Sequence, residues 1–490
     1  MVRKSQSPFP HLLLNNGYIK DQVYHTIRNA ILDGRLTERT KIPSTRALAE
    51  MMAISRNSVI AGFERLIDEG YLIARKGSGT YVSTTIPDEL ITTNPSPDYL
   101  KRKVISAPDL SATANRLMPF WEKIKLTSDQ YPIFNIGVGC VDQFLHELWG
   151  QLSGRVWRHS KKTIGQFNRP DGYPLLKKVL ADYVHSTRGV NCREDQIIIV
   201  NGTQQAINLA ARVLLQPDDK VWLDDPGYDS ARAIFTSMGA QIAPIPSDEQ
   251  GMDIAYGAAN HSDARLVYTS PSHQFPLGTT LALSRRLALL DWANQHNAWI
   301  FEDDYNSEFR YLSKPIQALQ GLDTTQRVIY AGTFSKMLYP GLRIGFLVVP
   351  EALIDAFTMM KYYSDTLSGY LEQVVLAHFI QEGHYARHVR RVRKLCYERQ
   401  TALFNAINRY LPHVFDVNIT DSGIHMVCRL KDGFTEKEII TKCRQLGLGA
   451  QPLSRYCIHS FSDKAILFGY AAHTPAEINE NIKRLSKLLV

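Results

Sequence analysis

Apolar residues near the amino terminus recur at the spacing of short amphipathic helices. Positions 23, 27 and 31 fall on one face of a helix that Gly34 ends. A second helix is expected to start at Ser44, which suits an N-cap position. Ser55 can cap a third helix, whose apolar face repeats at positions 59, 63 and 66. The pattern therefore predicts three short helices in close succession.

Two strand-like segments follow the third helix and flank the sequence Lys-Gly-Ser-Gly at residues 76–79. The two glycines permit the positive backbone angles of a hairpin tip. Three helices followed by a hairpin are typical of a winged helix-turn-helix. A small helical protein-interaction domain is the alternative, because it can share the helix pattern. We predict a winged helix-turn-helix over residues 11–83.

Beyond Pro132 the pattern changes to short apolar runs, rich in β-branched residues, that alternate with segments of helical spacing. Runs of the first kind lie at 197–202, 220–228, 265–273 and 327–336. Such alternation predicts parallel βα units, in which ligand groups lie at the carboxyl ends of the strands. We therefore predict an α/β main domain over residues 131–490.

Residues 84–130 lie between these two regions and contain Pro87, Pro95, Pro97 and Pro108 together with a cluster of Thr, Ser and Asn. This composition predicts an extended linker rather than a third core. Part of the linker is expected to pack, because Phe120 and Trp121 are costly to leave exposed.

The chain has 490 residues, which favours two or more domains. A hydrophobic content of 44% and a charged content of 21% are typical of a globular protein. The net charge is +8, and residues 1–83 hold twelve Lys or Arg against seven Asp or Glu. A basic amino-terminal region suits binding to the phosphates of nucleic acid, although solvated surface lysines give the same count.

Six cysteines are scattered without the spacing of a metal site, so we expect free thiols and no metal. The amino terminus lacks the apolar segment of an export signal. No run of about 18 apolar residues suggests a membrane span. We expect a cytoplasmic protein that does not bind membranes.

In the winged helix-turn-helix, short or forked donors in the first turn of the third helix are placed to reach base edges in the major groove. Side chains at the start of the second helix and at the hairpin tip are placed to contact phosphates. The predicted DNA-binding residues are Thr45, Arg46, Arg56, Asn57, Ser58 and Lys76.

A single lysine, Lys336, follows the buried strand predicted before it. A lysine amine held among apolar and hydroxylic neighbours has a lowered pKa and can form a Schiff base with an aldehyde. Seven residues later, Arg343 supplies a cation suited to a phosphate. An aldehyde beside a phosphate suggests pyridoxal 5'-phosphate (PLP). An ordinary lysine at the rim of the domain is the alternative for this segment alone.

Further candidates stand at other predicted strand ends. Thr203 and Gln204 open a helix, where backbone amides can receive phosphate oxygens. Tyr228 follows a Pro-Gly turn and offers a flat face for a pyridine ring. Asp303 can keep a pyridine nitrogen protonated, and Tyr305 can donate to a ring hydroxyl from the same strand. A helix cap, a core aromatic residue and a surface acidic pair are the alternatives for each signal taken singly.

Two resemblances follow from these motifs. IPSTRALAE, SRNSV, ERLIDEGYL and KGSGTYV together resemble the DNA-binding domain of GntR-type bacterial regulators, over about residues 18–83. The order GTQ, PGY, DDY and SK, followed by Arg343, resembles the fold-type I PLP enzymes of the aspartate aminotransferase superfamily. With both parts in one chain, the protein resembles the MocR/GabR-type regulators.

The resemblance implies a mostly parallel sheet in the main domain, with a smaller carboxyl-terminal α+β part. It also implies PLP as the cofactor. It further implies a homodimer that binds paired half-sites of promoter DNA, and in one arrangement the two subunits exchange their DNA-binding domains, or heads. The implied cofactor contacts are Lys336 as the Schiff base, Asp303, Tyr305, Tyr228, Thr203, Gln204, Thr333 and Arg343.

Two places depart from the aminotransferase pattern. Residues 275–278 read FPLG where many aminotransferases have NPTG, so an asparagine that contacts the ring hydroxyl is absent. An arginine that binds the substrate carboxylate often stands just before the motif that reads LFGYA here, and that place is apolar. Arg455 is the candidate substitute for binding an effector, with a surface arginine as the alternative.

The function implied is a PLP-dependent transcriptional regulator that binds promoter DNA. It is expected to sense PLP itself, or an amine or amino acid that forms an external aldimine with PLP. The alternative is a catalytically active aminotransferase with an accessory DNA-binding head, and slow transamination is compatible with both. The basic winged helix favours the regulator, because catalysis alone gives no reason for it.

Overall fold

The computed structural model describes residues 18–85, 109–124, 132–159, 169–459 and 463–489. The chain divides into two compact units, Met1–Asp109 and Leu110–Val490. Residues 11–17 of the predicted head and 86–108 and 125–130 of the predicted linker lie outside the described residues. Among the described residues, no helix combines the length and the hydropathy that a membrane span needs.

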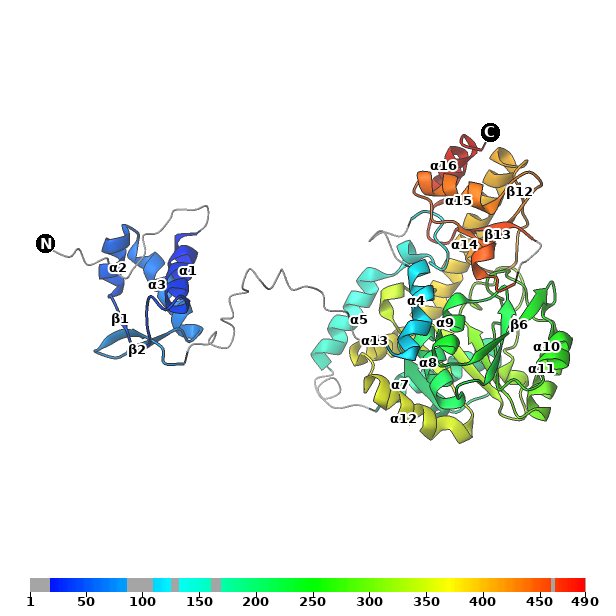
Figure 1. Cartoon of the computed structure of the whole chain (residues 1–490), viewed down its shortest axis with the longest axis horizontal. Helices are drawn as coiled ribbons and strands as arrows, with labels where there is room; N and C mark the ends of the chain where they lie inside the picture. The colour runs from blue at the N-terminus through cyan, green and yellow to red at the C-terminus, as the bar shows by residue number, and fades with distance from the viewer. Residues whose placement is uncertain (1–17, 86–108, 125–131, 160–168, 460–462, 490) are drawn as a thin grey trace. The chain divides into compact units, whose positions relative to one another are not determined.

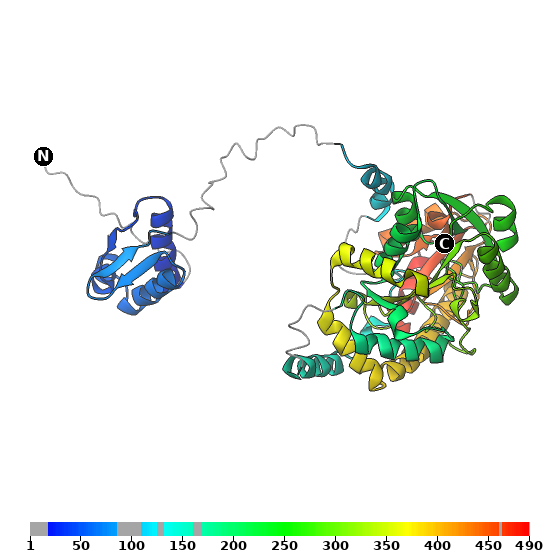
Figure 2. The same cartoon turned by 90° about the horizontal axis from the view of Figure 1, so that it is seen from below.

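The described part of the first unit contains three helices and a three-stranded antiparallel sheet in the order β1-β3-β2. Figure 2 shows these strands beside the helices. The elements are α1 (Ile19–Leu32), β1 (Lys41–Ile42), α2 (Thr45–Met52), α3 (Arg56–Asp68), β2 (Leu72–Arg75) and β3 (Gly79–Val82). The predicted winged helix-turn-helix is confirmed. Only the two-residue strand β1 was not predicted, because so short a run has no readable period.

Both predicted caps of the first unit are present. The Ser44 hydroxyl accepts a hydrogen bond from the Ala47 amide at 3.2 Å, and the Ser55 hydroxyl accepts one from the Ser58 amide at 3.2 Å. These bonds satisfy amides that the first helical turn leaves unpaired. The apolar residues at helical spacing in α1 and α3 form the core of this unit. The local sequence therefore fixes where α2 and α3 begin, which positions their exposed first turns.

A helix forms where the sequence predicted an extended linker. α4 (Ala112–Ile124) belongs to the second unit and packs against α9 (Asp229–Ser237), as Figure 1 also shows. The Ser111 hydroxyl caps it by accepting from the Ala114 amide at 3.2 Å. Residues 112–124 are thus helical, and the proline-rich composition that suggested a tether lies mostly on the amino-terminal side of them.

The second unit is built on an eight-stranded sheet in the order β4-β11-β10-β9-β8-β5-β6-β7. Pairing is parallel from β10 through β9, β8 and β5 to β6, whereas β11 and β7 run antiparallel to their neighbours. The strands are β4 (Ile197–Val200), β5 (Lys220–Asp225), β6 (Gln241–Asp248), β7 (Gly251–Met252), β8 (Leu266–Thr269), β9 (Trp299–Asp304), β10 (Val328–Thr333) and β11 (Gly345–Val348). The prediction of a mostly parallel sheet is confirmed.

Helices cover both faces of this sheet. On one face, Ile329 of β10 shares a core with Ile207 of α8, and on the other, Val328 shares a core with Leu289 of α11. Successive strand residues point to opposite faces, so a strand buried on both faces is apolar throughout. The helices of the second unit, besides α4 and α9, are α5 (His146–His159), α7 (Pro174–Arg188), α8 (Thr203–Leu214), α10 (Ile254–Asn260), α11 (Leu283–Gln295), α12 (Ile354–Asp365), α13 (Tyr370–Gln381), α14 (His384–Tyr410), α15 (Glu436–Gln445) and α16 (Pro475–Ser486).

A smaller carboxyl-terminal part contains an antiparallel sheet in the order β12-β13-β15-β14. Its strands are β12 (Phe415–Asp416), β13 (His425–Leu430), β14 (Gln451–Pro452) and β15 (Ala465–Gly469). Figure 1 shows α15 and α16 with these strands at one end of the second unit. The short 3-10 helices of the second unit are η2 (Val141–Gln143), η3 (Glu194–Gln196), η4 (Gln320–Leu322), η5 (Pro340–Leu342), η6 (Glu351–Leu353) and η7 (Leu453–Tyr456). The predicted α+β part is confirmed.

Candidate functional site

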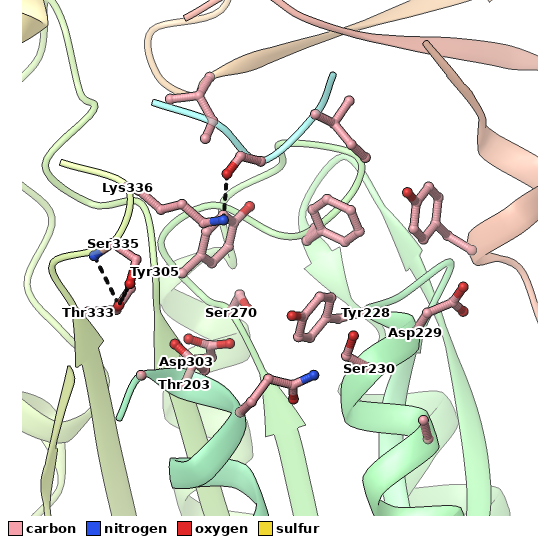
Figure 3. A pocket seen from close by; sticks show the side chains of 18 of the residues that line it. Thr203, Tyr228, Asp229, Ser230, Ser270, Asp303, Tyr305, Thr333, Ser335 and Lys336 are labelled. Atoms are coloured by element: carbon pink, nitrogen blue, oxygen red, sulfur yellow. Dashed lines mark hydrogen bonds between the residues drawn. The ribbon is translucent and has the colours of Figure 1, made fainter. Parts of the chain in front are cut away.

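One cavity of the second unit, with a volume of about 350 Å³, lies beside the carboxyl ends of β9 and β10. Figure 3 shows its polar side chains converging from several strand ends and from the start of α8. All nine residues predicted to contact a cofactor or an effector line it. They are Thr203, Gln204, Tyr228, Asp303, Tyr305, Thr333, Lys336, Arg343 and Arg455.

The amine of Lys336 is held at the cavity wall. It donates a hydrogen bond from Nζ to the Gly137 carbonyl at 2.5 Å (Figure 3). Burial lowers the pKa of this amine, while Asp303 raises it and Arg343 lowers it further. A lowered pKa increases the fraction of neutral, nucleophilic amine.

The loop that contacts Lys336 requires glycine. A Cβ added to Gly139 would stand 1.8 Å from the backbone carbonyl oxygen of Lys336. Any side chain at position 139 would therefore displace the backbone that carries the lysine. The hydrogen bond between Lys336 and Gly137 joins two segments that lie about two hundred residues apart in the sequence.

Asp303 points into the cavity from β9. Its Oδ2 atom accepts a hydrogen bond from the Tyr268 hydroxyl at 2.6 Å, and its Oδ1 atom is buried without a partner among the described residues. Burial raises the pKa of this carboxyl to about 7, against the opposing effect of the Tyr268 bond. An unpaired buried oxygen is costly unless a ligand satisfies it.

The neighbouring carboxylate, Asp304, points the other way. It accepts from Arg188 Nε at 2.7 Å and from the Tyr330 hydroxyl at 2.6 Å. Both carboxylates are about 4% exposed, so the interpretation as a surface acidic pair is wrong. Successive side chains of a strand point to opposite faces of the sheet, so Asp303 faces the cavity and Asp304 forms a buried ion pair with Arg188.

Two of the predicted tyrosines, Tyr228 and Tyr305, also line the cavity. Tyr305 lies one residue beyond the end of β9, whereas the sequence suggested that it belongs to the strand. Its hydroxyl is buried, and Asn306 lies beside it without making a hydrogen bond of normal geometry. The Tyr228 ring meets the Phe275 ring edge-on, with centroids 5.7 Å apart. Phe275 thus occupies wall space where many aminotransferases have an asparagine.

The phosphate-binding candidates gather at the start of α8. Gly202 caps this helix with a φ of 90°, a value that favours glycine. A Cβ at Gly202 would lie 3.6 Å from the Arg343 guanidinium, so this cation stands beside the helix start. Thr203 and Gln204 belong to the first turn of the helix, where backbone amides have no intrahelical acceptor. The helix dipole adds positive potential at the same place.

Arg455 lies at another part of the cavity wall, in η7. Its Nη1 donates to Gln451 Oε1 at 2.9 Å, and its Nε lies 3.9 Å from Asp229 Oδ2. The residue just before the LFGYA motif, Ile466, is fully buried in β15. The usual place of a carboxylate-binding arginine is therefore inside the carboxyl-terminal core.

Several cavity residues were not found from the sequence. They are Phe120, Gly137, Ser230, Tyr268, Ser270, Ser335, His425 and Tyr456. β8 is buried throughout, and the tyrosine near its carboxyl end was a signal for Tyr268, because its hydroxyl is placed there to donate a hydrogen bond. His425 and Tyr456 come from the carboxyl-terminal part, and only the folded chain brings them near β9.

In the first unit, the predicted DNA-binding residues lie at the start of α2, the start of α3 and the hairpin tip. Arg46, Arg56, Asn57 and Lys76 are exposed. Arg46 lies 3.4 Å from Glu50, but both side chains are at least 71% exposed, so this ion pair contributes little to stability. The Ser58 hydroxyl instead lies 2.8 Å from the Ser55 hydroxyl, within the cap of α3.

The raised pKa of Asp303 predicts a pH dependence of stability in the PLP-free protein. The unfolded carboxyl has a pKa of about 4, so between about pH 4 and about 7 the folded state holds a proton that the unfolded state releases. The free energy of unfolding should therefore fall as the pH rises through this window. Asp303→Asn should make that fall less steep, because asparagine does not titrate. Some fall should remain, because other buried carboxyls such as Glu302 titrate in both proteins. Thermal unfolding of both PLP-free proteins across the window measures the difference, and parallel curves would contradict the assignment.

Residues 122–485 match the family of aminotransferase class I and II, and residues 19–82 match the bacterial regulatory proteins of the gntR family. Over 464 residues, the chain is 36% identical to the probable rhizopine catabolism regulatory protein MocR of Rhizobium meliloti, covering 95% of this chain and 92% of that protein. It is 28% identical to the HTH-type pyridoxine biosynthesis transcriptional regulator PdxR of Corynebacterium glutamicum, covering 93% of this chain and 92% of the other.

Among solved structures, the chain is similar to a kynurenine aminotransferase from Pyrococcus horikoshii in complex with PMP. The TM-score is 0.68 and the sequence identity 26%, covering 80% of this chain and 98% of that one. The similarity confirms the predicted fold of the second unit.

Proposed function

The chain belongs to the MocR-type regulators, which join a GntR-family DNA-binding domain to an aminotransferase class I and II domain, and from this premise we propose that it senses a ligand of its PLP site. It is a DNA-binding transcriptional regulator, and its cofactor is PLP. We infer that PLP, or an amine or amino acid that reacts with it, changes the affinity of the head for promoter DNA.

The observation that carries this proposal is the convergence of one amine and two unsatisfied buried oxygens in one cavity. Lys336 presents an amine of lowered pKa, Asp303 an unpaired carboxylate oxygen and Tyr305 a buried hydroxyl. These groups fit the aldehyde, the ring nitrogen and the ring hydroxyl of PLP. When bound, PLP supplies an aldehyde that bonds covalently to amines.

Each side chain has a distinct task in this proposal. Lys336 binds the cofactor covalently, and Asp303, oriented by Tyr268, holds a proton on the ring nitrogen. Tyr228 packs on the ring, and Tyr305 donates to its hydroxyl. The amides of Thr203 and Gln204 at the start of α8 hold the phosphate, together with Thr333 and the positive charge of Arg343.

A sensor needs a ligand that binds two conformations with different affinity. One relative is named for pyridoxine biosynthesis and another for rhizopine catabolism, so the relatives are named for different pathways. We take PLP as the first ligand to test and Arg455 as the residue that contacts an effector beyond the ring. We also propose a homodimer that binds paired half-sites, with exchanged heads as one arrangement.

A working aminotransferase is the second candidate, because Lys336, Asp303 and Arg343 all line the cavity. Burial of Ile466 at the usual place of the carboxylate-binding arginine weighs against an ordinary amino acid substrate. The exposed first turn of α3 weighs the same way, since catalysis does not use it.

Arg56→Ala should test the regulator, because that candidate requires control of a gene through the recognition helix. Loss of a base contact costs about 1–3 kcal/mol, so the affinity for DNA upstream of the gene should fall about tenfold or more while PLP binding stays. A reporter gene under that DNA should also lose its control. Arg35→Ala is the matched control, because Arg35 is an exposed arginine of the same unit that pairs with Asp33. Equal losses in both variants would show a general charge effect and refute the recognition-helix assignment.

A further inference from the structure

The cavity wall includes a residue from the segment that leads to the DNA-binding head. Phe120 of α4 lines the same cavity as Lys336 and Arg455. α4 is the first element of the second unit, and residues 83–111 of the chain join it to β3 of the first unit. Phe120 therefore belongs both to the cavity wall and to the first helix that follows the DNA-binding head in the sequence.

Phe120 is also joined to the effector end of the cavity by charged side chains. The Arg232 guanidinium lies 5.7 Å from the centre of the Phe120 ring, a cation–π geometry. Arg232 forms an ion pair with Asp229, whose other oxygen lies 3.9 Å from Arg455 Nε. Asp229 and Ser230 stand at the start of α9 and face the cavity in Figure 3. A ligand that changes the position of Arg455 or Asp229 thus changes the surroundings of Phe120.

α4 packs on α9 through few buried side chains. Among its described side chains, at residues 112–121, only Ala114 and Phe120 are partly buried, and Trp121 is 57% exposed. Pro119 lies inside the helix and lacks the N–H that would bond to the carbonyl of Asn115. A helix with an internal proline and few buried side chains belongs to the low-stability end of a structure.

We propose that Phe120 contacts the ligand of the PLP cavity and that occupancy of the cavity controls whether α4 is seated on α9. A ligand excludes water from the cavity and adds contacts to the exposed part of the Phe120 ring, which stabilises the seated helix. The seated helix spans about 20 Å, whereas the same 13 residues span about 40 Å when extended. Release of α4 would therefore lengthen the connection to the head, which gives occupancy a mechanical effect on DNA binding. The inference rests on the proposed sensing of PLP.

Hydrogen exchange in the full-length protein tests this inference, with PLP as the probe. Peptides that cover residues 112–124 should exchange about tenfold more slowly after PLP loading, the effect of improved burial of one aromatic side chain. Phe120→Ala, compared at saturating PLP as judged by visible absorption, should lose this slowing. Trp121→Ala, on the same helix but outside the cavity, should keep it.

The inference is overturned if PLP leaves exchange of α4 in the wild type unchanged, or if the slowing persists in Phe120→Ala. Equal loss in Trp121→Ala would assign the effect to general helix stability and overturn it as well. If PLP alters DNA affinity to the same extent in the wild type and in Phe120→Ala, PLP sensing stands and only the role of Phe120 fails. If PLP slows exchange of α4 but leaves DNA affinity unchanged, the sensing proposal fails instead.

Discussion

Lys336→Ala is expected to abolish covalent binding of PLP and the visible absorption that PLP gives when bonded to a lysine. The nitrogen of Lys336 is the cavity amine whose pKa is lowered by burial, and alanine cannot form the bond. The variant should also lose any effect of PLP on DNA affinity while its PLP-free DNA affinity stays equal to that of the wild type. Visible absorption spectra and DNA titrations with and without PLP measure both effects.

Lys314→Ala is the matched control for this substitution, because Lys314 is an exposed lysine of the same unit. It should keep the colour and the response to PLP. Persistence of the lysine-bound absorption in Lys336→Ala, or its loss in both variants, would show that another amine binds PLP.

Asp303→Asn is expected to weaken PLP binding by about a hundredfold or more. Removing one partner of a buried charged pair costs about 3–5 kcal/mol, and asparagine cannot neutralise a protonated ring nitrogen. The Tyr268 hydroxyl, which bonds to Asp303 at 2.6 Å, would keep an acceptor in the asparagine oxygen, so the fold should persist. Equilibrium titration of the PLP-free proteins with PLP measures the change in affinity.

Asp304→Asn provides the contrast on the other face of the same strand. It weakens the partner of the buried Arg188, whose guanidinium bonds to Asp304 at 2.7 Å, so the melting temperature should fall. The affinity of the folded protein for PLP should change far less than in Asp303→Asn. The opposite ranking of the two variants would reverse the assignment of the two carboxylates.

Local sequence was sufficient for the features that depend on local chemistry. Ser44 and Ser55 cap their helices because a hydroxyl before a helical run satisfies amides of its own first turn. The strand-end motifs converge because parallel strands end at the same edge of the sheet, and the register pairs Ala331 with Asp303. Both arguments need only neighbours in sequence and one topological rule.

Features that depend on distant neighbours were not predictable. The motif order pointed to Asp303, but the sequence did not show the partners of the two carboxylates, because Tyr268 and Arg188 come from other elements. The contact of Gly137 with Lys336 is equally remote in sequence. α4 was missed because helix formation there depends on packing against α9, which outweighs the unfavourable Pro119.

The central claim is that filling the PLP site changes the DNA affinity of the head. The most direct measurement is the dissociation constant of the full-length protein for DNA upstream of its gene, with and without PLP, at one salt concentration. We predict a change of about fivefold or more in the wild type and none in Lys336→Ala. An unchanged dissociation constant in wild-type protein that is visibly loaded with PLP would contradict the claim.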